Sequence, residues 1–227
     1  MLNKISVVMS VYNDQNNLER AIESILGQTY TNFEFLILDD SSTDDSLNII
    51  QKYSKDERVK IHINKQNLGL TKSLNILVNI SEGKYIFRQD SDDISLPKRF
   101  EKQIEVLEKK EFRVCTSRAI NPQNNKVIPG LSSWIPKKLI IKYKNPYIHG
   151  TLAIEKNLLQ SLNNYDEEYY YSQDYKLYLD LISKNEKIFE MKEPLYLLNT
   201  ENNISSKNKN VQKYFFKKAL KNYVQDK

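Results

Sequence analysis

One stretch decides the fold of this chain, GKYIFRQDSDDISLP at residues 83–97. Its apolar start predicts a buried strand from residue 85, and Pro97 predicts the first turn of a following helix. Between them lie Asp90, Asp92 and Asp93, whose carboxylates repel one another and are costly to desolvate. A divalent cation resolves this conflict, and hard oxygen ligands suit Mg²⁺ or Mn²⁺. The alternative is an exposed acidic turn that caps the next helix, but a position at the end of an apolar strand favours a metal site.

Strand and helix patterns alternate around this stretch. Short apolar runs predict strands at residues 5–11, 33–38, 59–63, 85–87 and 112–116, and helical spacing predicts helices at 16–26, 44–53, 71–80 and 97–109. This alternation predicts an α/β fold with a mostly parallel central sheet flanked by helices. The second half is less regular: we expect a loop at 121–135, a strand at 149–154, a helix at 174–183 and a mobile polar segment at 199–210.

Sheets of this kind bind ligands at the carboxyl ends of their strands. The first strand ends in Ser10-Val11-Tyr12-Asn13, the second in Asp39-Asp40, and the fourth in the acidic residues 90–93. We therefore expect the functional site at this edge of the sheet, where acidic side chains gather.

The composition is that of a globular domain that needs no disulfide bonds or structural metal for its stability. The chain has 227 residues, 40% of them hydrophobic and 28% charged, which is enough for a core of its own. A single Cys115 forms no internal disulfide, and two His do not make a Cys/His zinc site. The start does not fit a signal peptide, and no apolar run approaches the roughly 20 residues of a membrane span. We expect a cytoplasmic protein.

The C-terminal end is basic. Residues 207–227 hold seven Lys against one acidic residue, within a net charge of +5. A helix here would place Phe216, Leu220, Tyr223 and Val224 on one face. This segment is a candidate for peripheral contact with the inner face of the cell membrane, near a lipid-linked acceptor. The alternative is a solvated helix.

Four ordered segments of the first 110 residues resemble the inverting family 2 glycosyltransferases. They are the stretch at 83–97, which is similar to the family's D-x-D segment, VVMSVYN at 7–13, LDDSSTD at 38–44, and NLGL with SLN at 67–75. The resemblance implies the GT-A fold. It also implies transfer of a hexose or amino-hexose from a nucleotide sugar, with UDP as the favoured nucleotide, to a hydroxyl of a glycan or glycolipid in cell-surface polysaccharide synthesis. Mn²⁺ or Mg²⁺ is the implied cofactor.

The resemblance also implies roles for residues at the expected edge. Asp39 accepts a hydrogen bond from the nucleobase, and Gly69 lets the backbone approach the nucleotide. Asp92 is the direct metal ligand, supported by Asp93. The remaining donor-site residues are Ser10 and Tyr12 beside the base, Lys72 and Arg88 near the diphosphate, and Asp90 and Ser91 near the ribose or sugar. For Tyr12 a place in the core, and for Lys72 a surface ion pair, stay open.

The second half carries a partial match. SQDYKL at 172–177 resembles the family's E-D-x-x-L motif, with Gln173 in place of Glu, and implies that Asp174 is the general base. A helix N-cap is the alternative for Asp174. His149 resembles the His of an H-P-T segment on the acceptor side. Where the family often has a metal-binding His, this chain has Thr200.

These assignments suggest three parts: a nucleotide-sugar-binding half at 1–110, an acceptor-binding half at 111–204 and a basic extension at 205–227. Other enzyme classes lack their motifs here. The first strand is not followed by the G-x-G-x-x-G of a Rossmann dehydrogenase or by the G-K-[ST] of a P-loop enzyme. It is also not followed by the basic, Gly-rich loop of a nucleotidyltransferase. The acidic edge opposes nucleic-acid binding. A catalytically silent nucleotide-sugar-binding subunit of a polysaccharide-assembly complex remains the alternative function, favoured by Gln173 and Thr200.

Overall fold

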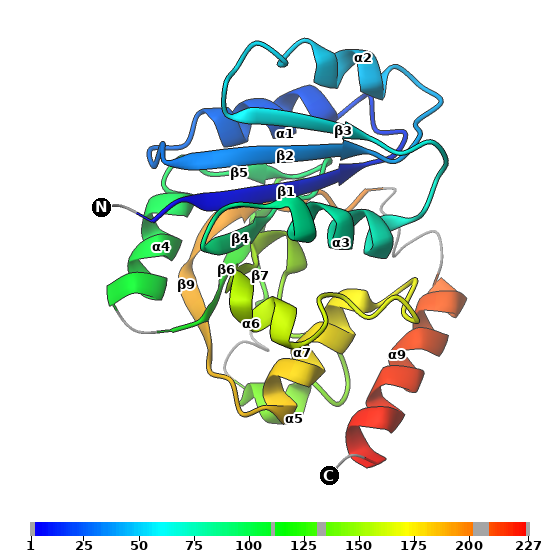
Figure 1. Cartoon of the computed structure of the whole chain (residues 1–227). Helices are drawn as coiled ribbons and strands as arrows, with labels where there is room; N and C mark the ends of the chain where they lie inside the picture. Colours follow the sequence, from blue (N-terminus) through cyan, green and yellow to red (C-terminus); the bar gives the residue numbers. More distant parts are fainter. Residues whose placement is uncertain (1–2, 110–111, 131–134, 202–208, 226–227) are drawn as a thin grey trace.

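The computed structural model describes residues 3–109, 112–130, 135–201 and 209–225 (Figure 1). Within these residues nine strands form one mixed sheet in the order β3-β2-β1-β4-β8-β6-β9-β5, with β7 paired to β6. Helices cover both faces, so the predicted α/β architecture is confirmed. The sheet runs through both predicted halves of the chain, and the proposed division at residues 110 and 204 stays a prediction.

The first half is a parallel α/β unit. β1 (Ile5–Val11) pairs in parallel with β2 (Phe33–Asp39) and β4 (Tyr85–Arg88), and β2 pairs with β3 (Val59–Ile63). β1 and β2 are buried along their whole length, as strands covered on both faces must be. The connecting helices are α1 (Leu18–Leu26), α2 (Ser46–Gln51), α3 (Leu70–Ile80) and α4 (Arg99–Lys109). Each confirms the predicted element to within a few residues.

The second half adds antiparallel strands. β8 (Ala153–Glu155) lies antiparallel between β4 and β6 (Val114–Asn121), and β9 (Ile188–Leu197) runs parallel to β6 before pairing with β5 (Ile94–Ser95). The expected loop at 121–135 contains β7 (Lys126–Ile128), so that prediction was wrong there. The expected strand at 149–154 is a 3-10 turn, η2 (His149–Thr151), followed by β8. The helices are α5 (Lys137–Ile140), α6 (Lys156–Ser161), α7 (Gln173–Ser183) and α9 (Lys209–Gln225).

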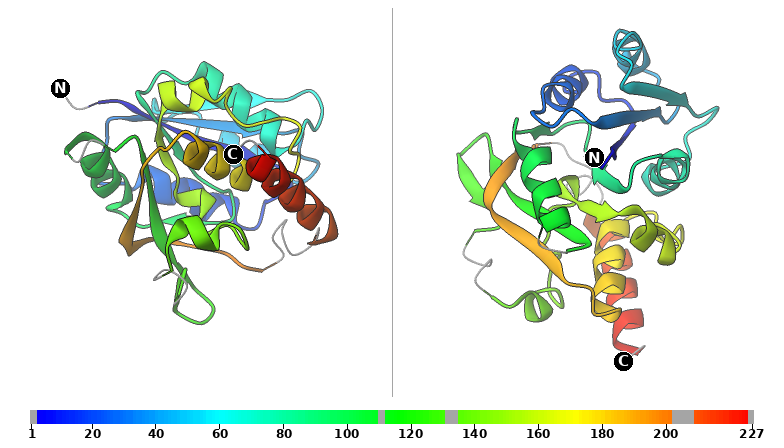
Figure 2. Two further views of the ribbon diagram at one scale, coloured as in Figure 1. Left: turned by 90° about the horizontal axis from the view of Figure 1, so that it is seen from below. Right: turned by 60° about the vertical axis from the view of Figure 1, so that its left-hand side comes forward.

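The C-terminal helix lies along α7, as both views in Figure 2 show. Phe216 stacks on Tyr175 of α7 with ring centroids 4.1 Å apart, Tyr223 is buried, and Leu220 packs against the same core. Three of the four apolar side chains expected on the membrane-facing side therefore face the protein, and Val224 is exposed. Most of the segment expected to be mobile, 202–208, lies outside the described residues. No described helix is long and apolar enough to cross a membrane.

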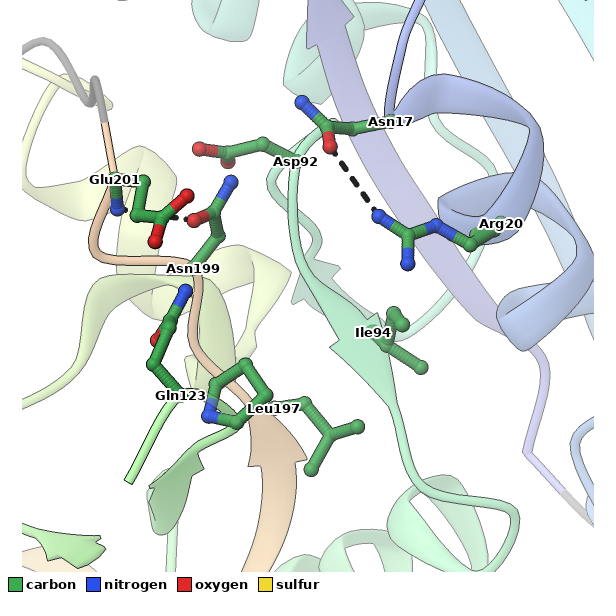
Figure 3. A pocket seen from close by; sticks show the side chains of 9 residues that line it. Asn17, Arg20, Asp92, Ile94, Gln123, Leu197, Asn199 and Glu201 are labelled. Atoms are coloured by element: carbon green, nitrogen blue, oxygen red, sulfur yellow. Dashed lines mark hydrogen bonds between the residues drawn. The ribbon is translucent and has the colours of Figure 1, made fainter. Parts of the chain in front are cut away.

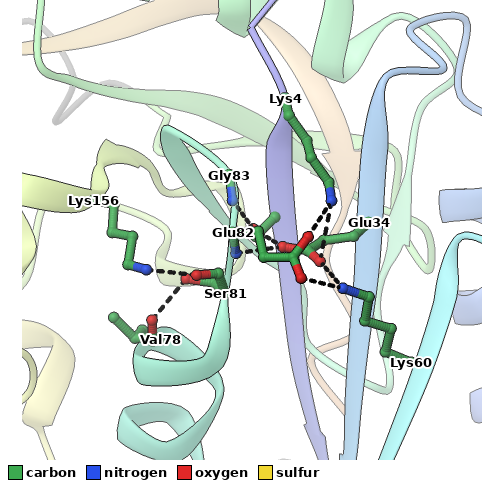
Figure 4. A network of polar contacts seen from close by, with 9 residues as sticks. Lys4, Glu34, Lys60, Val78, Ser81, Glu82, Gly83 and Lys156 are labelled. Carbon is green, nitrogen blue, oxygen red and sulfur yellow. Dashed lines mark hydrogen bonds and ion pairs between the residues drawn. The ribbon is translucent and has the colours of Figure 1, made fainter.

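A buried carboxylate fastens the beginnings of the central strands (Figure 4). Glu34 of β2 is 2% exposed and accepts hydrogen bonds from Ser6 Oγ at 2.5 Å, the Glu82 N–H at 2.6 Å and Lys60 Nζ at 2.7 Å. Burial by itself raises the pKa of Glu34, but these donors and the charge of Lys4 overcome it and lower the pKa to about 2. This network holds β1, β2 and β3 in register at the edge opposite the expected site.

Candidate active site

Asp39 ends β2 at the predicted edge of the sheet and is 1% exposed. Its Oδ2 accepts the Ser42 N–H at 3.0 Å, while its Oδ1 is buried and has no hydrogen-bond partner among the residues that the structure describes. Buried polar atoms almost always have partners, so an unpaired carboxylate oxygen points to a ligand that donates to it. On the neighbouring strand β1, Ser10 is buried and Tyr12 is half exposed just beyond the strand end, which excludes a core position for Tyr12.

The adjacent Asp40 has a structural role that the sequence analysis did not assign. Its carboxylate accepts the N–H groups of Leu68 and Gly69 at 2.9 and 2.8 Å and the Asn64 amide at 2.7 Å. These bonds hold the loop before α3 against the end of β2. Asp39 is thereby left as the carboxylate of this pair that is available to a ligand.

Gly69 adopts a φ of +85°, a conformation that favours glycine. A Cβ at Gly69 would lie 2.7 Å from Cζ of Tyr170, an exposed ring from the second half of the chain. The glycine therefore makes room for this ring, and its approach to a nucleotide stays a prediction. Tyr170 was missed because nothing local connects it to residue 69. On the next helix, Lys72 is exposed, as either of its predicted roles requires.

The buried Arg88 and the partly buried Asp90 form an ion pair at the end of β4. Arg88 is 1% exposed and pairs with Asp90 Oδ1, and the Asp90 N–H donates to Tyr196 Oη at 3.1 Å. The guanidinium thus holds Asp90 in place, and contact between Arg88 and a diphosphate stays a prediction. A Cβ at Gly150 would lie 2.8 Å from Asp90 Oδ2, so this glycine brings η2 directly against the carboxylate.

Asp92 faces a cavity of about 290 Å³ with Arg20, Asn199 and Glu201 on its walls (Figure 3). Burial, followed by the negative charges of Asp90 and Asp14, raises the pKa of Asp92 to about 7. Asp14 is a further member of this acidic cluster, since it accepts the Ser91 hydroxyl at 2.6 Å.

Asp93 is not among the residues that line this cavity and instead contacts the segment that follows β9. It is 2% exposed, and its Oδ1 accepts the Asn199 N–H at 2.6 Å. Burial and the charges of Asp90 and Asp92 raise its pKa well above the usual range. Asp93 thus anchors the segment that walls the cavity, and its supporting role toward a metal stays a prediction.

The acidic cluster fits a hard divalent cation. Among the described residues no three Asp, Glu, His or Cys side chains converge closely enough to hold an ion by themselves. Mg²⁺ in such sites takes one or two carboxylates and completes its shell with substrate phosphates and water. Asp92, with Asp90 beside it, supplies ligands of that type and number. Thr200 is turned toward the β6–β7 hairpin, where its hydroxyl accepts the Asn121 amide at 3.0 Å.

Asp174 lies in the first turn of α7, and the N-cap position of this helix is Ser172. The alternative that Asp174 caps the helix was therefore wrong. Its Oδ2 instead accepts a hydrogen bond of 2.7 Å from Nδ2 of Asn145. Gln173, where the family motif has Glu, is buried.

His149 lies within electrostatic reach of both Asp174 and Asp90. Burial lowers its pKa to about 4 against the opposing charge of Asp174, so the ring is neutral at pH 7. Its Nε2 lies 3.2 Å from Tyr165 Oη, and its Nδ1 is buried with no hydrogen-bond partner in the described part of the chain. The charges of Asp90 and Asp174 act on both His149 and Tyr178. These charges, with the close approach of Gly150 to Asp90, indicate that Asp174, His149 and the acidic segment lie near one another, and their roles as base and acceptor-side residue stay predictions.

Comparisons with known proteins show which proteins this chain is similar to. The sequence model of "Glycosyl transferase family 2" matches residues 6–175, a range that includes Asp174. The chain is 35% identical over 170 residues to the putative glycosyltransferase EpsE of Bacillus subtilis, covering 71% of this chain and 60% of that protein. It is 32% identical over 187 residues to the UDP-Glc:alpha-D-GlcNAc-diphosphoundecaprenol beta-1,3-glucosyltransferase WfaP of Escherichia coli, covering 81% and 72%.

Solved structures share the fold. TarS 1–349 of S. aureus in complex with UDP has a TM-score of 0.77 at 19% identity, covering 97% of this chain and 65% of that one. The mannosyltransferase PcManGT of Pyrobaculum calidifontis, in complex with GDP-Man and Mn²⁺, has a TM-score of 0.77 at 14% identity, covering 98% and 64%. They confirm the predicted GT-A architecture. The chain spans 59% to 66% of the first three curated relatives.

Proposed function

We propose that this chain, which belongs to glycosyl transferase family 2, transfers a sugar from a UDP-sugar to a hydroxyl group with inversion at the anomeric carbon. The acceptor is a glycan or a lipid-linked sugar. The name of the relative WfaP gives a lipid-linked sugar, alpha-D-GlcNAc-diphosphoundecaprenol, for that protein. The resemblance that implied this activity covered the first 110 residues, and the family match extends it to residue 175.

The proposal that the nucleotide is UDP rests on the unpaired Oδ1 of Asp39. Since Oδ2 already accepts the Ser42 N–H, one oxygen remains for the base. Uracil offers a single donor, N3–H, between two carbonyl oxygens, and matches one free acceptor. Guanine offers two adjacent donors, which a carboxylate with both oxygens free would suit better. This difference supports UDP over GDP.

The proposed reaction divides the remaining roles between the two sides of the site. Asp174 takes the proton of the acceptor hydroxyl as this attacks the anomeric carbon. Neutral His149, whose pKa is about 4, lines the acceptor side without adding charge. On the donor side, Asp92 would hold Mg²⁺ or Mn²⁺, which supplies charge neutralisation for the departing diphosphate.

A titration of UDP with and without Mn²⁺ tests this function. We expect Mn²⁺-dependent binding that is lost in Asp92→Ala and kept in Asp45→Ala, which removes an exposed carboxylate at the start of α2. UDP release from UDP-glucose or UDP-N-acetylglucosamine then measures turnover. UDP binding without release from any UDP-sugar would favour the silent-subunit alternative, and an absence of UDP binding would contradict the proposal.

Membrane contact is the last part of the proposal. Because Phe216 and Tyr223 face α7, contact would come from the outer face of α9, where Lys213, Lys217 and Lys221 are exposed at i, i+4 spacing. Lysines near an anionic membrane contribute about 1 kcal/mol each. We expect charge reversal of these three lysines to abolish binding to phosphatidylglycerol vesicles. Unchanged vesicle binding would rule out this face.

A further inference from the structure

Asn145 joins the segment after α5 to the first turn of α7. Its Nδ2 donates to Asp174 Oδ2 at 2.7 Å, and its Oδ1 accepts the Tyr147 N–H at 3.1 Å. A backbone N–H donates and cannot accept, so it fixes the oxygen of the amide on its own side. The NH₂ group of Asn145 must then face Asp174.

The segment that carries Asn145 is packed on α7 at two places. The ring centroid of Tyr147 lies 4.6 Å from that of Tyr178, which is one helical turn after Asp174. Tyr175, the residue after Asp174, donates its hydroxyl to the Ile141 carbonyl at 2.6 Å. Contacts on both sides of the Asn145–Asp174 bond therefore fix the distance between the two side chains.

This hydrogen bond leaves the two oxygens of Asp174 unequal. Oδ2 is occupied by the amide, and in the part of the chain that the structure describes Oδ1 accepts no hydrogen bond. A carboxylate without such a partner rotates, and a general base needs one oxygen within hydrogen-bond reach of the proton it takes.

We propose that Asn145 is a positioning residue that holds Asp174 with Oδ1 toward the acceptor hydroxyl. This inference rests on the proposed function, in which Asp174 is the general base. In the transfer step the acceptor O–H bond breaks and its proton passes to Oδ1. The acceptor oxygen bonds to the anomeric carbon, and the bond from that carbon to the diphosphate breaks, its electron pair leaving with UDP. Asn145 donates throughout and exchanges no proton.

The groups around Asp174 allow a test by pH. His149, Tyr165 and Tyr178 respond to the charge of Asp174, and Asp90 acts on all three, with Arg88 on the first two. Burial lowers the pKa of His149 to about 4 and raises those of both tyrosines. These three groups therefore keep their charge between about pH 5.5 and pH 8.

The decisive variant is Asn145→Asp. It keeps an oxygen for the Tyr147 N–H but replaces the donor with a carboxylate facing Asp174. With UDP-glucose and UDP-N-acetylglucosamine as probes and Mn²⁺ present, we expect kcat for UDP release to fall more than tenfold at pH 8, while the Kd of UDP stays within twofold. At pH 5.5 the deficit should shrink, because two adjacent carboxyl groups share a proton and the new carboxylic acid then donates to Asp174.

Asn48→Asp is the matched control, since Asn48 donates to Asp45 Oδ1 at the same 2.7 Å on the exposed side of α2. It should leave kcat unchanged. Full kcat in both Asn145→Asp and Asn145→Ala, or a deficit that is the same at both pH values, would overturn the positioning role. A wild-type protein that releases no UDP from any UDP-sugar would instead defeat the proposed function, and this inference with it.

Discussion

Asp39→Asn should change which nucleotide the protein prefers. In the variant, the amide oxygen keeps the Ser42 N–H that Oδ2 accepts at 3.0 Å. Nδ2 then replaces the unpaired Oδ1 and presents a donor where the wild type presents an acceptor. The N3–H of uracil meets another donor, whereas the unprotonated N3 of cytosine gains a partner.

The size of this effect follows from the burial of the site. A hydrogen bond to a charged group contributes about 1.5–3 kcal/mol, and Asp39 is 1% exposed, so water does not replace the lost partner. UDP affinity should fall about 10- to 150-fold, and CDP should bind the variant more tightly than UDP does.

Calorimetric titration of UDP and CDP into both proteins, with Mn²⁺ present, measures the change. Asp45→Asn makes the same substitution at an exposed aspartate and should leave both affinities unchanged. If Asp39→Asn binds UDP as the wild type does, or loses both nucleotides in equal proportion, then Asp39 does not read the base and the argument from its unpaired oxygen is refuted.

Three further predictions follow from contacts in the structure. Glu34→Gln should lower the free energy of unfolding at pH 7 by about 2 kcal/mol. The shift of the Glu34 pKa to about 2 corresponds to about 3 kcal/mol of stability. Because its partners Lys4 and Lys60 are partly exposed, solvent screening reduces this value. A carboxylate whose pKa is lowered in the folded protein stabilises it at pH values above the pKa of the unfolded chain. In urea unfolding, the difference in stability between the wild type and the variant should therefore disappear as the pH falls from about 4.5 toward 2. Gly69→Ala should destabilise the protein by about 1–2 kcal/mol, because residue 69 has a φ of +85° and the added Cβ would overlap with Tyr170. In thermal unfolding, the double variant with Tyr170→Ala should regain only part of the lost stability, because the strain of the positive φ remains. Asp174→Asn should lower kcat for UDP release about 100-fold or more while UDP titration shows an unchanged Kd, and a parallel loss of UDP binding would speak against its role as a base.

The first half of the chain could be predicted from sequence because its signals are local. β1 is a short, mostly apolar run, β3 alternates apolar and polar residues, and α3 has an apolar face, so each of these elements is recognisable without its neighbours. The rule that ligands bind at the carboxyl ends of strands then led to Asp39 and to the acidic segment. The structure placed an unpaired oxygen at the first and a cavity at the second.

The second half could not be predicted in the same way. β9 carries Glu190, Lys192, Glu193 and Pro194 and is only partly buried, so it has no apolar run to mark it. The β7 hairpin strand is three residues long and largely exposed. The contact between Asn145 and Asp174 joins residues 29 positions apart, through side chains that are ordinary in a loop and in a helix. Only the folded packing of α7 on the preceding segment reveals it.

The two halves of the chain approach each other most closely at Gly69 and Gly150, where a side chain would collide with the opposite half. At Gly150 a Cβ would lie 2.8 Å from Asp90 Oδ2 and as close to the ring of Tyr196, whose hydroxyl accepts the Asp90 N–H. The similar family segment reads H-P-T, and a proline in place of Gly150 would require Asp90 or Tyr196 to move. Because His149 precedes this glycine, the close approach also sets where the neutral imidazole stands relative to the acidic segment. In this chain the position of Asp90 therefore depends on Gly150, a residue of the second half, so the two halves form one structural unit at this point.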